Sequence, residues 1–96
     1  MRKVSGDMNI GEDSIKEVRK MEYDLQTKEI SNVIVQALVT ERKRQGSTQQ
    51  KIADNTGMKT SNVTRFESCK YTPTLEVLTR YADALGKKLH IELVDK

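Results

Sequence analysis

Residues 48–66 read TQQKIADNTGMKTSNVTRF, and this stretch decides the fold. Thr48 or Ser47 can cap a helix over residues 49–56, because a hydroxyl at that place accepts a hydrogen bond from the first helical turn. Gly57 then favours the left-handed backbone conformation with which many helices end. The pattern predicts a short helix followed by a tight turn.

A second short helix follows the turn, opening at Lys59 or Thr60 and running to about Glu67. Ala53 must be small, because the two helices cross closely there. Four apolar side chains are expected to set the angle between the helices: Ile52, Met58, Val63 and Phe66. This arrangement is a helix-turn-helix, whose second helix lies on the surface at an angle suited to the major groove of DNA.

Upstream of this motif, the spacing of apolar residues predicts a helix that begins at Ile30 and ends at Gly46. Its expected inward face has residues at i, i+3, i+4, i+7 and i+8: Ile30, Val33, Ile34, Ala37 and Leu38. A basic run, Arg42-Lys43-Arg44, suits the C-terminal end of that helix.

Downstream, Thr72 can cap a fourth helix with Pro73 in its first turn, closing at Gly86. Its expected apolar residues are Leu75, Val77, Leu78, Tyr81, Ala82 and Leu85. In residues 87–96, apolar and polar residues alternate with period two, which predicts a short half-buried strand. Because no second strand is predicted, we expect this strand to pair with its copy in a homodimer.

The interface expected for that homodimer is formed by Leu89, Ile91 and Leu93, with Tyr81 and Leu85 as further contributors. Residues 1–29 form an N-terminal arm, partly disordered or with one short helix that starts after Asp13 or Ser14. The predicted organisation is thus an arm over 1–29, a DNA-binding domain over 30–86 and a dimerisation strand over 87–96.

Composition narrows the possible functions of this chain of 96 residues. Residues 31–70 hold seven Lys and Arg against three Asp and Glu, which is the local excess that phosphate binding requires. A single cysteine, Cys69, excludes an internal disulfide, and a single histidine, His90, argues against zinc. We expect no cofactor, no metal and no enzymatic activity. The start of the chain lacks the apolar run of a signal peptide, so we expect a cytoplasmic protein.

The chain resembles the phage-repressor-like helix-turn-helix family, often called the Cro/repressor or XRE type. The matching residues extend over about 33–86 and are Arg42, Gly46, Thr48-Gln49, Ile52-Ala53, Gly57, Ser61, Val63, Arg65-Phe66-Glu67, Pro73, Leu75, Leu78, Ala82 and Ala84-Leu85-Gly86. The resemblance implies an all-α, repressor-like domain of four to five helices, here followed by the short dimerisation strand.

The resemblance also implies roles for individual residues. The exposed face that enters the major groove comprises Lys59, Thr60, Ser61, Asn62 and Arg65, of which Arg65 suits guanine and Asn62 adenine. The residues matching phosphate contacts are Thr48, Gln49, Lys70, Tyr71 and Thr72. Gln49 matches a position whose side chain also braces the recognition helix. Arg42 and Glu67 match a structural pair that ties the first helix to the end of the recognition helix.

Several of these residues have an alternative role that does not involve DNA. Thr60, Ser61 and Asn62 can instead cap the third helix, and Arg65 can pair with a surface carboxylate. Cys69 stands where the family usually has glycine, so a positive φ there would strain the backbone.

We therefore expect a dimeric, sequence-specific transcriptional repressor on a palindromic operator in double-stranded DNA. The helix-turn-helix followed by G-K-K-L-x-I-x-L also looks like the antitoxins of toxin–antitoxin pairs, in which the arm would contact a toxin. The alternative from another class is a protein-interaction module that uses this scaffold without DNA binding.

Overall fold

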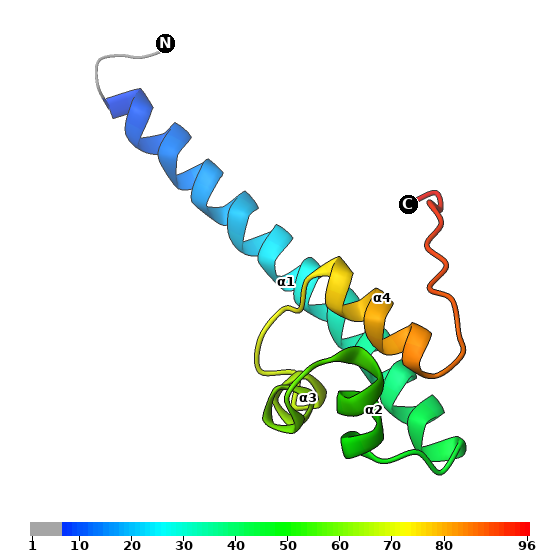
Figure 1. Ribbon diagram of the computed structural model, residues 1–96. Helices are drawn as coiled ribbons and strands as arrows, with labels where there is room; N and C mark the ends of the chain where they lie inside the picture. Colours follow the sequence, from blue (N-terminus) through cyan, green and yellow to red (C-terminus); the bar gives the residue numbers. More distant parts are fainter. Residues whose placement is uncertain (1–6) are drawn as a thin grey trace. The chain divides into compact units, whose positions relative to one another are not determined.

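The computed structural model describes the backbone of residues 7–96 and the side chains of residues 15–96. Over this range it contains helices and no strand (Figure 1): α1 (Asp7–Arg44), α2 (Gln49–Thr56), α3 (Thr60–Glu67) and α4 (Leu75–Ala84). The chain divides into two units, Met1–Ile30 and Ser31–Lys96, and α1 contributes to both. None of these helices has an apolar stretch that would cross a membrane, as far as the chain is described.

The two helices predicted from residues 48–66 are present with their expected bounds. The Thr48 hydroxyl accepts a hydrogen bond from the Lys51 amide at 3.1 Å, which caps α2. Gly57 has φ 76° and donates its amide to the Ala53 carbonyl at 2.9 Å, closing α2 in the left-handed conformation. The helix-turn-helix is therefore confirmed, and with it the all-α fold class.

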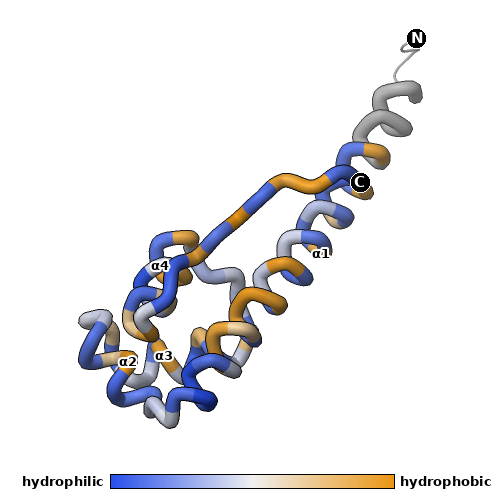
Figure 2. Tube along the Cα trace, turned by 90° about the vertical axis from the view of Figure 1, so that its right-hand side faces the viewer, coloured by the Kyte–Doolittle hydropathy of each residue, from blue (hydrophilic) through white to orange (hydrophobic). Residues whose placement is uncertain are grey.

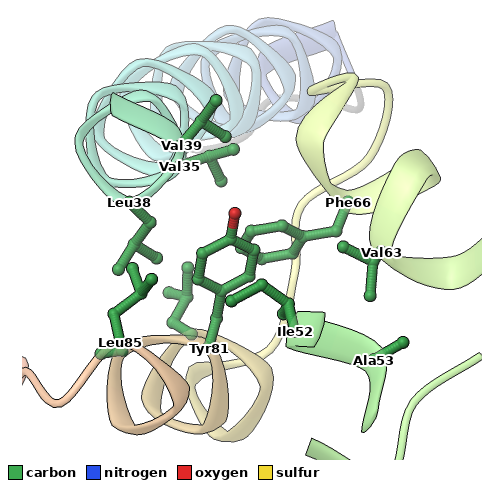
Figure 3. Close-up of a cluster of buried hydrophobic side chains, with 11 residues drawn as sticks. Val35, Leu38, Val39, Ile52, Ala53, Val63, Phe66, Tyr81 and Leu85 are labelled. Carbon is green, nitrogen blue, oxygen red and sulfur yellow. The ribbon is translucent and has the colours of Figure 1, made fainter. Parts of the chain in front are cut away.

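One apolar core holds the second unit together (Figure 3). Phe66 and Tyr81 stack at its centre with ring centroids 4.9 Å apart. All four helices contribute, and the buried members are Val35, Leu38, Val39, Ile52, Ala53, Val63, Phe66, Leu78, Tyr81, Ala82 and Leu85. Met58 packs against this cluster while only partly buried.

The inward face of α1 is the expected pattern shifted by one residue. Val35, Leu38 and Val39 are buried, whereas Val33 is 70% exposed and Ala37 also lies on the surface. Apolar residues are dense enough here to form two overlapping stripes. Arg42 lies on the same face as Val35 and Val39, so the stripe that is buried is also the one that directs Arg42 toward Glu67.

Helix α4 begins two residues later than expected. Thr74, not Thr72, is its cap, since the Thr74 hydroxyl accepts from the Val77 amide at 3.2 Å. This start leaves Leu75 59% exposed, contrary to the prediction of a buried leucine. Tyr81 and Leu85 were expected to help form a dimer interface, but both are buried in the core and are unavailable for one.

The two ends of the chain also differ from expectation. In place of one short helix after Asp13 or Ser14, helix α1 is continuous from Asp7 and includes Gly11. A single glycine costs about 1 kcal/mol and does not break a long helix. Residues 1–6 of the arm lie outside the described residues. Residues 87–96 alternate in hydropathy (Figure 2) but form no strand, because a single chain offers their backbone no strand to pair with.

Candidate nucleic-acid interface

Helix α3 presents a polar face to solvent. Val63 and Phe66 anchor its inner side, and Lys59, Ser61, Asn62 and Arg65 are exposed while Thr60 is half-buried. The residue that caps α3 is Lys59, without a side-chain hydrogen bond. The alternative in which Thr60, Ser61 or Asn62 caps the helix is therefore not adopted.

Gln49 braces α3 against α2 through both ends of its amide. Its Nε2 donates to Glu67 Oε1 at 3.0 Å, and its Oε1 accepts from the Thr64 hydroxyl at 2.7 Å. Both bonds run from the first residue of α2 to α3, so they fix the rotation of α3 about its axis. Thr64 was missed by the sequence analysis, although it lies one helical turn from Ser61 on the outer face.

A second bridge joins the two helices beside the first. The Thr60 hydroxyl donates to Gln50 Oε1 at 2.7 Å, and Gln50 Nε2 donates to Asp54 Oδ1 at 2.8 Å. Gln50 was also missed, because an exposed glutamine in a helix carries no distinctive signal. Thr60 keeps acceptor capacity on its hydroxyl oxygen, while Ser61 and Asn62 make no side-chain hydrogen bond within residues 15–96.

The carboxylate of Glu67 collects donors from three other helices in what we call the Glu67 cluster, formed by Arg42, Gln49, Glu67 and Tyr81. Arg42 binds it through Nε and Nη2, both at 2.8 Å, and Tyr81 donates its hydroxyl at 2.6 Å. Arg42 Nη1 also donates to the Ser47 carbonyl at 2.9 Å. The pair implied between Arg42 and Glu67 is present, and it holds the end of α3 in place.

The electrostatics of the Glu67 cluster follow from this geometry. Burial alone would raise the pKa of the Glu67 carboxyl, but the bonds from Arg42, Tyr81 and Gln49 outweigh it and hold the pKa below its ordinary value. Burial and the adjacent carboxylate raise the pKa of the Tyr81 hydroxyl. At neutral pH, Glu67 is thus a charged acceptor and Tyr81 a neutral donor.

Two residues assigned to different kinds of DNA contact lie together at the end of α3. The guanidinium of Arg65 stacks over the ring of Tyr71, with its carbon 4.7 Å from the ring centroid. This places Arg65 against an aromatic face rather than against a carboxylate, so its alternative as a surface ion pair is not adopted here. Lys70 and Thr72, on either side of Tyr71, are exposed.

The loop after α3 keeps a left-handed backbone despite its cysteine. Cys69 has φ 59°, the one positive φ at a non-glycine residue in the described part of the chain. This confirms that the position needs the conformation that glycine adopts most easily. The side chain compensates in part, because it packs against the core and its sulfur accepts from the Gln36 amide at 3.5 Å.

The lysines around α3 remain available for anions. Lys51, Lys59 and Lys70 are exposed and form no ion pair among residues 15–96. By contrast, Arg44 and Lys87 lie against Glu41, where hydrogen bonds from Arg44 and Gln45 lower the pKa of that carboxyl to about 2. The helix-turn-helix and the loop after it therefore carry three lysines whose charge no carboxylate of residues 15–96 neutralises.

Comparison with known proteins yields one match. A protein-family model described as helix-turn-helix matches residues 38–91, more than half of the chain. No curated protein and no solved structure matches it. The matched residues include α2, α3, α4 and the last turns of α1, which together carry the geometry described above.

Proposed function

Because this chain belongs to the helix-turn-helix family of XRE type, whose members are DNA-binding transcriptional regulators, we propose that it is a dimeric repressor of a palindromic operator. The observation that carries the proposal is the bracing of α3 from behind by Gln49 and Glu67. That bracing leaves its outer face polar, cationic and free of internal bonds at Ser61 and Asn62. A helix rigidly held in this way can enter the major groove with little loss of conformational entropy.

Base reading is assigned to Lys59, Thr60, Ser61, Asn62 and Arg65. Arg65 is the strongest candidate, since a guanidinium can bind guanine O6 and N7 together. Its stacking on Tyr71 limits its rotamers before DNA arrives. Asn62 suits adenine but lies toward the edge of the outer face, about 100° around the helix from Ser61.

Phosphate binding is assigned to Thr48, Gln49, Lys70, Tyr71 and Thr72. Thr48 and Gln49 lie at the N-terminal end of α2, and the other three follow α3. The Gln49 amide is already used in bracing, so its share in phosphate binding is the smallest of the five. Lys51, outside this set, is a further exposed cation in α2.

Selection from random duplexes with the purified protein tests sequence specificity and operator symmetry together. On the selected site, Arg65→Ala should cost about 1–3 kcal/mol of binding free energy and relax the preference at one base pair. Lys70→Ala should weaken selected and unrelated DNA alike and reduce the salt dependence. Arg80→Ala is the matched control, because Arg80 is an exposed arginine on α4 paired with Glu76. A selection that returns no preferred sequence contradicts the proposal.

Dimerisation is assigned to the C-terminal segment. Ile91 is 63% and Leu93 100% exposed, and Leu89 and Ile91 line a groove of about 490 Å³ beside Leu75 and Thr79 of α4. Pairing two copies of residues 89–93 across a two-fold axis would satisfy their backbone groups and cover these side chains. Sedimentation of the full chain should show a dimer that Ile91→Asp dissociates, and a monomer at high micromolar concentration contradicts it.

Two further assignments complete the proposal. A repressor of this kind acts where the DNA is, so we assign the protein to the cytoplasm. The likeness of residues 86–93 to antitoxins suggests autoregulation together with a toxin, which a small reading frame for a basic ribonuclease-like or kinase-like protein next to this gene would support. The alternative, a protein-interaction module, predicts no steep loss of DNA binding between about 50 and 200 mM salt, whereas DNA recognition predicts one.

A further inference from the structure

The N-terminal half of α1 carries an apolar stripe that no residue of 15–96 covers. Every side chain from Ile15 to Ile30 is exposed. Four apolar residues follow one side of the helix at i, i+3, i+6 and i+10, and we call them the arm stripe: Ile15 (55% exposed), Val18 (53%), Met21 (63%) and Leu25 (62%). Helices gain most of their stability by packing such a stripe against a partner.

Charged residues are not spread evenly around this helix. At 100° per residue, Glu17 and Asp24 flank the seam of Val18, Met21 and Leu25 on one side. Glu22 and Glu29 flank this seam on the other side, between Val18 and Ile15, and we call these two acidic rows the borders. Lys16 and Lys20 lie on the opposite side, Arg19 lies beyond Ile15 on the side of Glu22, and Lys28 lies at the C-terminal end of the stripe. Residues 15–29 hold four acidic and four basic residues, so it is their placement that makes the borders acidic.

This placement disfavours a second copy of the same helix as the partner. In a parallel pair seamed by Val18, Met21 and Leu25, Glu17 would face Glu22 of the second copy, and Asp24 would face Glu29. In an antiparallel pair, each border would face the same border of the second copy, so carboxylates would again lie opposite carboxylates. Like charges at these flanking positions are repulsive in both orientations.

The same placement favours a partner whose apolar contact surface has basic borders. We propose that the arm stripe is a docking surface for another protein, which receives it with an apolar helix face or groove rimmed by Lys and Arg. The borders then form ion pairs on both sides of a buried apolar seam, and they select the partner by charge. This proposal does not depend on DNA binding, since none of its residues belongs to the candidate nucleic-acid interface.

Two synthetic amphipathic helices of about 20 residues serve as probes for the full chain. They share one Leu/Val stripe and differ only at the flanking positions, which are Lys in one peptide and Glu in the other. We expect the Lys-flanked peptide to bind about tenfold or more tightly than the Glu-flanked one, with a preference that falls as salt rises. Fluorescence anisotropy of labelled peptide measures both affinities.

Two sets of variants locate the site. Val18→Ser with Leu25→Ser should abolish binding, whereas Lys20→Ser with Thr27→Ser, at the same spacing on the opposite side, should retain it. Glu17→Lys, Glu22→Lys, Asp24→Lys and Glu29→Lys together should reverse the preference toward the Glu-flanked peptide. If the serine substitutions unfold the helix, the four-lysine variant still tests the proposal, because it keeps all four apolar residues of the arm stripe. Unchanged operator binding in each variant separates this surface from the proposed function.

Three results would overturn the inference. The first is equal or absent binding of the two peptides. The second is sedimentation that shows self-association lost in the Val18→Ser, Leu25→Ser variant, because a second copy would then be the occupant. The third is binding of the arm stripe to vesicles of anionic lipid in preference to the Lys-flanked peptide, since the acidic borders should repel such a surface.

Discussion

Helix α1 joins two regions that share a pattern and differ in burial. In residues 31–44, Val35, Leu38 and Val39 recur at helical spacing and are at most 8% exposed. In residues 15–30, Val18 and Leu25 recur at similar spacing and are more than half exposed. Amphipathic spacing therefore determines that both regions are helical, while burial depends on which other elements are present to cover the stripe.

The ion pairs of the two regions differ in the same way. Arg42 and Glu67 meet at 2.8 Å with side chains 11% and 8% exposed. Lys20 and Asp24 lie 3.9 Å apart with side chains 80% and 69% exposed. A carboxylate that is shielded from water and bound by several donors contributes to stability, whereas an exposed pair on one helix contributes little. The second unit should therefore respond to mutation far more strongly than the first.

The largest contrast should come from removing one apolar side chain from each region. Phe66→Ala should lower the free energy of unfolding by about 3–5 kcal/mol, because it leaves a cavity beside Tyr81 in the core. Leu25→Ala should change it by less than about 0.5 kcal/mol, because Leu25 is already in water. Urea denaturation of the full chain measures both. A comparable loss in the two variants would show that the arm is packed in solution.

A smaller effect, dependent on pH, is expected at Glu67. At pH 7, Glu67→Gln should cost about 1.5–3 kcal/mol, because it removes the charge that Arg42, Gln49 and Tyr81 bind. The pKa of this carboxyl is lower in the folded chain than its ordinary value of 4.5, so its contribution is complete above that value and is lost as the pH falls through the folded pKa.

The difference in unfolding free energy between the original chain and Glu67→Gln should accordingly become smaller in acid, because both side chains are then uncharged. Denaturation midpoints between pH 7 and about 2 follow this convergence. Leu25→Ala, in the arm, serves as the control, because it changes no ionisable group. A deficit that stays constant with pH would mean that Glu67 acts through its shape rather than its charge.

Two glycines should give effects of opposite sign. Gly57→Ala should destabilise the second unit by about 1–2 kcal/mol, because φ is 76° there. A methyl group at Gly57 would meet no atom within 4 Å, so the whole cost comes from the backbone. Gly11→Ala should instead favour helix α1 by about 1 kcal/mol, since Gly11 lies inside it. Circular dichroism for the helical signal and denaturation for the core distinguish the two.

The smallest effect should follow from breaking the exposed ion pair. Asp24→Asn should change the stability of helix α1 by less than about 0.5 kcal/mol, and less still at high salt. Thermal melting of the helical signal at low and high salt measures it. A loss that approaches that of Glu67→Gln would contradict the difference drawn between the two ion pairs.

The central motif could be predicted from the sequence because its signals are local. Thr48 caps α2, Gly57 ends it, and Val63 and Phe66 are buried in α3, all within the twenty residues 48–67 that include both helices. The family pattern, which has glycine at the place of Cys69, raised the question of a positive φ there, and the structure answers it with φ 59°. Such features depend on residues close in the chain or on a match to a known pattern.

Features that depend on distant residues were predicted less well. The stripe of α1 that turns inward depends on contacts with the other helices, among them the ion pair of Arg42 with Glu67. The start of α4 depends on which of two nearby threonines caps it. The bracing of α3 by Gln49 was implied by the resemblance, but its partners Thr64 and Glu67 needed coordinates. The DNA contacts, the dimer and the strand remain predictions, since each needs a second molecule to form.

The Glu67 cluster also limits how this sequence can evolve. One carboxylate there accepts hydrogen bonds from donors in α1, α2 and α4. Replacing it alone would leave a guanidinium, an amide and a phenol hydroxyl partly buried and without their acceptor. Homologues that have lost the acid should therefore carry substitutions at the positions of Arg42 and Tyr81 as well. Correlated changes at these sites, rather than independent drift, would be the evolutionary record of this shared acceptor.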